Sequence, residues 1–103
     1  MTAIISVTTS RPRDGKFQEA MAAYAKAKAI LERCGGKVRV VSQMFGTTPM
    51  TFSVIVESAS WAEFGTLSAA VEADAEFQAF LAAARADPFG DIIQRSVFSE
   101  LPV

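Results

Sequence analysis

The chain has 103 residues, with ten basic and eleven acidic side chains, no histidine and one cysteine. This length suits one domain, and we expect a single domain over residues 1–103. No run of basic residues occurs, which argues against nucleic-acid binding, and no apolar run approaches the ~20 residues that span a bilayer. The first residues lack the pattern of an export signal, and Cys34 has no partner for an internal disulfide, so we expect a cytoplasmic protein.

The first half of the chain reads as a strand followed by a helix. Residues 3–10 are rich in β-branched side chains and end at the Pro and Gly of residues 11–15. A helical spacing of apolar residues then begins, and we expect a helix from Asp14, acting as its cap, to about Cys34. Its expected buried stripe consists of Phe17, Met21, Tyr24, Lys28 and Leu31.

The second half repeats this order after a hairpin. Residues 37–45 and 50–57 are expected strands joined by a turn over residues 46–49. Ser60 and Glu63 form the sequence pattern of a capping box, which predicts a second helix from that point.

The second helix has two apolar registers. They are separated by residues 72–74, so we expect a kink or break near Asp74. The helix should end at Asp87 because the residue before a proline disfavours helical backbone, and residues 91–98 should form the last strand.

The order strand, helix, strand, strand, helix, strand predicts an α+β fold of the ferredoxin-like β-α-β-β-α-β type. In it, a four-stranded antiparallel sheet carries two helices on one face. The strands hold bulky apolar residues on both faces, for example Ile4 with Ile5 and Val40 with Val41. The uncovered face therefore needs a cover, and we expect a homodimer in which two sheets pack face to face.

Four segments carry a resemblance to a known superfamily: residues 14–17 at the entry to the first helix, Glu57 at a strand end, Ser60-Trp61 at a helix start, and residues 72–80 in the second helix. With these segments the chain resembles the dimeric α+β barrel superfamily, particularly its NIPSNAP-like and antibiotic-biosynthesis-monooxygenase-like members. The resemblance implies a dimeric α+β barrel with a pocket between sheet and helices. Members that isomerise lactones, cyclise polyketides or bind haem tend to use a histidine, which this chain lacks. The resemblance thus disfavours haem degradation and histidine-dependent chemistry, and it leaves cofactor-free oxygenation of an electron-rich aromatic compound and plain ligand binding open.

Tyr24 and Arg39 are the candidate catalytic residues. Tyr24 lies on the expected buried stripe, where its hydroxyl either completes the core or orients a ligand. Arg39 and Gln43 share one face of the second strand. Their side chains either reach into a cavity, where they would hold a carboxylate, phenolate or carbonyl group, or cross the dimer interface and bond to the backbone of the partner. Trp61 is read as a core anchor or, in an enzyme, as a side chain packed on the substrate. The candidate substrate-binding residues are Phe17, Gln43, Ser53, Trp61, Phe64, Phe77 and Gln94.

The sequence offers few other groups for catalysis. No spacing of Cys, His, Asp or Glu predicts a metal site, Cys34 at a helix end is expected to be inert, and we expect no cofactor. The first hypothesis is a small dimeric protein with a mostly apolar pocket for an aromatic or polyketide-like molecule, with oxygenation or isomerisation as its reaction if it is an enzyme. The alternative is a non-catalytic dimeric module that binds a ligand or another protein.

Overall fold

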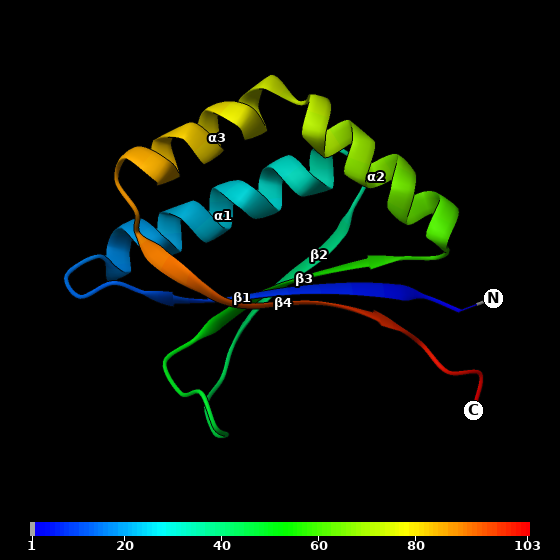
Figure 1. The fold of residues 1–103 in the computed structure, drawn as a ribbon, viewed down its shortest axis with the longest axis horizontal. Helices are drawn as coiled ribbons and strands as arrows, with labels where there is room; N and C mark the ends of the chain where they lie inside the picture. The colour runs from blue at the N-terminus through cyan, green and yellow to red at the C-terminus, as the bar shows by residue number, and fades with distance from the viewer. Residues whose placement is uncertain (1) are drawn as a thin grey trace.

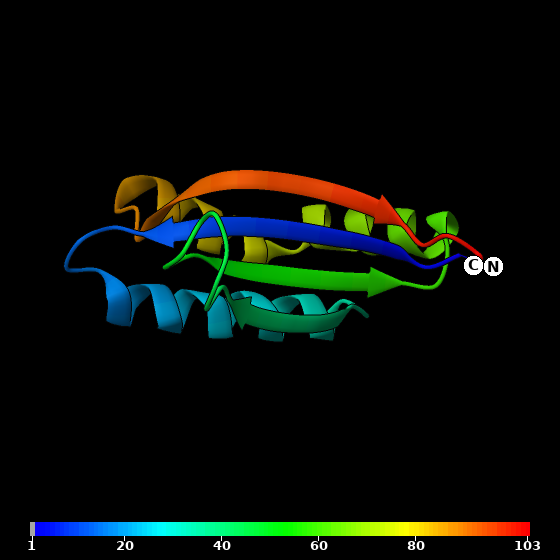
Figure 2. The same cartoon turned by 90° about the horizontal axis from the view of Figure 1, so that it is seen from below.

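The computed structural model describes residues 2–103, which form one four-stranded antiparallel sheet with three helices on one face (Figure 1). The elements are β1 (Ile4–Pro12), α1 (Phe17–Arg33), β2 (Lys37–Ser42), β3 (Phe52–Ser58), α2 (Trp61–Ala73), α3 (Ala75–Ala86) and β4 (Gly90–Ser99). The strand order is β2-β3-β1-β4, and the other face of the sheet carries no helix (Figure 2). The ferredoxin-like α+β class predicted from the sequence is therefore confirmed. None of the helices in residues 2–103 is long and apolar enough to cross a membrane.

Strand β1 lies between β3 and β4 and sends different chemistry to the two faces of the sheet. Val7 pairs with Ile55 on one side and with Ser96 on the other; the register with β3 is continuous, whereas the register with β4 shifts between Thr9 and Ser10. Ser6, Thr8 and Ser10 line the space under the helices. Because side chains alternate along a strand, Ile5 and Val7 lie on the helix-free face, which we call the open face.

The packed core occupies only part of the space between sheet and helices. Val38, Val56 and Leu67 are at most 8% exposed and contact one another, with half-buried apolar neighbours around them. This cluster joins β2 and β3 to α2. Helix α3 has no buried residue, so it does not complete a second packed core over β4.

The predicted Asp14 cap of the first helix is wrong. Helix α1 begins at Phe17, its N-terminal capping position is Lys16, and no side chain caps it. Gly15 has a φ of +77°, and the Lys16 amide donates to the Arg13 carbonyl over 2.9 Å. A tight turn therefore separates Asp14 from the helix, and glycine provides the left-handed conformation the turn needs.

The caps of the second helical region agree with the sequence. The Ser60 hydroxyl accepts from the Glu63 amide over 3.2 Å, and the Glu63 carboxylate accepts from the Ala59 amide over 2.9 Å. The predicted break at Asp74 is confirmed, because this residue ends α2 and caps α3 by accepting from the Phe77 amide over 2.8 Å. One carboxylate thus sets the start of the helix that covers the cavity described below.

Asp74 also connects α3 to the end of α1. The Arg33 guanidinium donates to both Asp74 oxygens, over 2.8 and 3.0 Å, and to Glu76 over 2.8 Å. The hydrogen bonds from Arg33, and after them the one from Phe77, lower the pKa of Asp74 below its ordinary value. This junction is the hydrogen-bonded corner between α1, α2 and α3.

The free energy of unfolding should depend on pH through the ionisation of Asp74 in this corner. Because the pKa of Asp74 is lower in the folded state than in the unfolded state, its contribution is complete above the unfolded pKa of about 3.9. It is lost as the pH falls through the folded value. We expect Asp74→Asn, which keeps a capping side chain, to lose less of its unfolding free energy than the wild type between pH 6 and pH 3 in urea titrations. Arg33→Gln should flatten the same dependence, and an unchanged dependence in both variants would contradict this role.

The hairpin strands are shorter than predicted. Strand β2 ends at Ser42 and β3 begins at Phe52, so residues 43–51 form a loop. The Gln43 amide still donates to the Thr51 carbonyl over 3.0 Å, but the Gln43 side chain turns back to accept from the Thr48 amide over 3.0 Å, and the extended pairing ends there. Gln43 and Phe45, predicted on the second strand, consequently lie in the loop and on no strand face.

Candidate functional site

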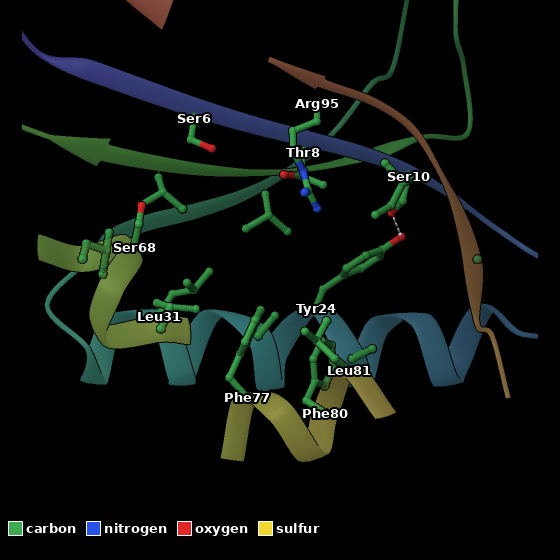
Figure 3. A pocket seen from close by; sticks show the side chains of 18 of the residues that line it. Ser6, Thr8, Ser10, Tyr24, Leu31, Ser68, Phe77, Phe80, Leu81 and Arg95 are labelled. Carbon is green, nitrogen blue, oxygen red and sulfur yellow. Dashed lines mark hydrogen bonds between the residues drawn. The ribbon is translucent and has the colours of Figure 1, made fainter. Parts of the chain in front are cut away.

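A cavity of about 390 Å³ lies between the sheet and the helices, beside the packed core (Figure 3). Its helix wall is mostly apolar but includes Ser68, and its sheet wall carries the hydroxyls of Ser6, Thr8 and Ser10 together with Arg95, among the apolar side chains of Val54, Val56 and Ile92. The helix wall and the turn before β4 contribute Ala23, Tyr24, Ala27, Leu31, Phe64, Leu67, Val71, Phe77, Phe80, Leu81 and Phe89. The cavity is therefore amphipathic: all of its aromatic groups lie on the helix wall and in the turn before β4, whereas its one cation and most of its hydroxyls lie on the sheet wall.

Tyr24 closes one end of the cavity. It is 5% exposed, and its hydroxyl lies 2.7 Å from the Ser10 hydroxyl on β1. The Phe52 and Phe89 rings flank it at centroid distances of 5.5 and 5.7 Å. Burial raises the pKa of Tyr24 above its ordinary value, and the hydrogen bond with Ser10 opposes that shift. At neutral pH the phenol stays protonated, so it can donate a hydrogen bond but is not a ready base.

Arg95 is the charged side chain of this cavity. It pairs with Thr8 across β1 and β4, and both side chains point from the sheet toward the helices (Figure 3). In the part of the chain that the structure describes, the Arg13 and Arg33 guanidinium groups bind carboxylates, whereas Arg95 has no hydrogen-bond or ion-pair partner. A guanidinium with five donors and no protein acceptor is free to bind an anion.

The cavity is open along the edge of the sheet. Ile92 and Arg95 line it but remain exposed to solvent, and β4 is the outermost strand on that side. A ligand can therefore enter beside β4 and place its polar edge against Arg95. Its apolar body would then contact the helix wall.

The structure brings three of the residues predicted from the sequence together at this site. Tyr24 from α1, Phe64 from α2 and Phe77 from α3 all line the cavity. Phe17 does not line it: its side chain is 52% exposed and packs on Phe52 at a centroid distance of 6.0 Å.

Three other predicted residues lie on the open face. Arg39 follows the buried Val38 on β2 and is exposed. The Ser53 hydroxyl lies 2.8 Å from that of Thr9, and the Gln94 amide donates to Ser96 over 3.1 Å. Thr9 pairs with Ser53 and with Gln94, so these polar side chains form one row across the open face, on the far side of the sheet from the cavity.

Trp61 is not the core anchor that the sequence suggested. Its side chain is 61% exposed, and it contacts the Phe64 ring edge-on at a centroid distance of 5.9 Å. Trp61 is the first residue of α2 and lies beyond the end of the packed core. It is therefore exposed, although its spacing matches that of the apolar face of the helix.

Sequence reasoning missed Phe80, Phe89 and Arg95 as parts of the site, and also the hydroxyls of β1. The alternation of aliphatic and hydroxyl residues over residues 5–8 is visible in the sequence and could have indicated a polar cavity wall. Arg95 was harder to place, because the register of β4 against β1 shifts between Thr9 and Ser10. Within residues 2–103 no group of three or more potential ligand residues could hold a metal ion.

Comparison with known proteins gives a clear result at the level of the fold. No protein-family profile and no curated protein matches the chain. Among solved structures, a NIPSNAP family protein from Agrobacterium tumefaciens superimposes with a TM-score of 0.73 at 19% identity, covering 98% of this chain and 86% of that one. An uncharacterised NIPSNAP domain protein from Burkholderia xenovorans gives 0.72 at 19% identity, with 97% and 94% covered.

A third structure is that of an enzyme. SnoaB, a cofactor-independent oxygenase from Streptomyces nogalater, gives a TM-score of 0.68 at 16% identity, covering 100% of this chain and 97% of that one. The chain therefore has the ferredoxin-like α+β fold that NIPSNAP proteins share with a cofactor-independent oxygenase, as its sequence resemblance implied.

Proposed function

We propose that the protein binds a planar aromatic or polyketide-like molecule that carries an acidic group, in the cavity between sheet and helices. The observation that carries this proposal is the division of the cavity into an aromatic wall and a wall with one unpaired arginine. Small-molecule sites are mostly apolar with a few polar groups that fix orientation, and their volumes fall in the range of roughly 300–1,000 Å³. The cavity of about 390 Å³ suits a molecule of two or three fused rings.

Binding can be tested with anthracene-9-carboxylate as the probe and neutral anthracene-9-methanol as its comparison. The carboxylate should raise the melting temperature in a concentration-dependent manner, because a ligand of the folded state alone stabilises it by about 2.7 kcal/mol at a concentration of 100 Kd. Phe77→Ser, which opens the aromatic wall, should weaken the effect, whereas Phe17→Ser outside the cavity should not. Failure of every aromatic acid and phenol in a broader screen to shift the transition would contradict the proposal.

Cofactor-independent oxygenation is the second candidate function, supported by the structural likeness to SnoaB. In such a reaction an aromatic CH₂ group and dioxygen give a ketone and water, which balances without an external reductant. Arg95 would stabilise the phenolate form of the substrate, and the protonated Tyr24 would donate to an oxygen of the substrate.

The oxidation is measurable with an electron-rich anthrone by oxygen uptake and quinone absorbance. Turnover that is lost in Tyr24→Phe would support catalysis, and the same assay on Arg39→Ala tests the role predicted for that residue from the sequence. Binding of the anthrone without oxygen uptake above the spontaneous rate would instead identify a non-catalytic binding protein.

We further propose that two copies pair through the open face. The support is the apolar character of that face, to which Ile5, Val7, Val41, Ile55 and Phe98 contribute. Val41 is 44% exposed and Phe98 is 51% exposed, which is unfavourable unless another surface covers them. Sedimentation equilibrium should yield a mass of two chains.

A further inference from the structure

The loop between β2 and β3, residues 43–51, stands off the sheet on the side of the open face (Figures 1 and 2). Three large apolar side chains of this loop are exposed to solvent: Met44 by 75%, Phe45 by 92% and Met50 by 73%. The loop contains no charged residue. Its surface is therefore unsuited to nucleic acid or to a charged peptide and suited to an apolar partner.

The exposure of these side chains follows from a defined loop structure. The Gln43 side chain accepts from the amide and the hydroxyl of Thr48. The Thr51 side chain is 1% exposed, and its hydroxyl donates to the Thr48 carbonyl over 2.7 Å. Met50 has a φ of +66°, in the left-handed region that non-glycine residues rarely adopt. The loop therefore holds an exposed apolar side chain on a backbone conformation that costs free energy.

We infer that the tip of this loop packs against a second copy of the chain. The inference rests on the proposed pairing through the open face. Packed sheets lie about 10 Å apart, so a second sheet on the open face would occupy the side toward which the loop projects. The loop would then lie beside the partner sheet and bury Met44, Phe45 and Met50 against it. This extends the apolar open face, in which Val41 on β2 leads directly into the loop.

Shortening the Phe45 side chain should change the affinity of the chain for a second copy. Phe45→Ser should weaken the dimer about tenfold or more in sedimentation equilibrium, since aromatic anchors dominate interface energetics. Because Phe45 is 92% exposed, the same substitution should leave the fold of each chain intact, as judged by circular dichroism. Val103→Ser removes another fully exposed apolar side chain and serves as the matched control with unchanged affinity.

A fluorescent label reports burial of the tip directly. In a Cys34→Ser background, acrylodan attached to Phe45→Cys should shift to shorter wavelength and become protected from quenching over the concentration range in which dimers form. A dimer in which the label stays as accessible as in the dilute protein, with Phe45→Ser at wild-type affinity, would overturn the role of the loop while leaving the proposed pairing intact. A chain that remains monomeric at millimolar concentration would overturn both.

Discussion

Arg95→Leu should weaken the binding of an aromatic carboxylate by about 10- to 100-fold. Hydrogen bonds to charged groups are worth about 1.5–3 kcal/mol, and Arg95 is the charged residue among those that line the cavity. Leucine retains apolar contact with the ligand, so the loss reports on the guanidinium. Isothermal titration calorimetry with anthracene-9-carboxylate measures the change, and the neutral alcohol should bind both proteins with similar affinity.

Arg39→Gln is the matched comparison, because Arg39 is the residue that sequence reasoning chose as the anion-binding cation. Its side chain lies on the open face, opposite the cavity, so we expect carboxylate binding to be unchanged. Loss of binding in Arg39→Gln together with full binding in Arg95→Leu would place the anion at Arg39 and contradict the site described here.

Leu67→Ala should lower the free energy of unfolding by about 2–5 kcal/mol, the range found when a buried leucine is cut to alanine. Leu67 is 8% exposed and contacts Val38 and Val56 in the packed core. It also lines the cavity, so its removal enlarges a space that the protein already leaves unfilled. Since small domains are stable by about 5–15 kcal/mol, this one change would remove a large part of the stability.

Urea titration measures this loss, and the surface residue Leu101 offers a control of the same type. Leu101 is 71% exposed, so Leu101→Ala should change the unfolding free energy by less than about 0.5 kcal/mol. Equal effects of the two substitutions would mean that the cluster around Leu67 is not the core of the fold.

The order of strands and helices was predictable because it depends on local patterns. The break at Asp74 followed from the change of apolar register, and the Ser60 cap followed from a short motif whose hydrogen bonds form within four residues. The Asp14 cap failed because Gly15 places a turn before α1, and the hairpin strands ended early because the Gln43 side chain folds back on Thr48. Both errors come from backbone and side-chain geometry that residue type alone does not reveal.

The candidate site was predictable only in part. Tyr24, Phe64 and Phe77 were found because apolar helix faces point toward the sheet. Trp61 had the same spacing but lies at the helix start, outside the packed core. The sequence left two places open for Arg39, a cavity or the dimer interface; Arg39 lies on the open face, and Arg95 is the arginine that lines the cavity.

The sequence by itself determined the α+β class, the element order and the presence of apolar residues on both faces of the strands, since each depends on spacing along the chain. Only the tertiary structure decided which face of each strand meets the helices. That choice depends on strand register and on the irregularity between Thr9 and Ser10, and a shift of one residue moves side chains to the other face. The register places Arg95 and the hydroxyl groups of β1 in the cavity. It places Arg39, Ser53 and Gln94 on the open face.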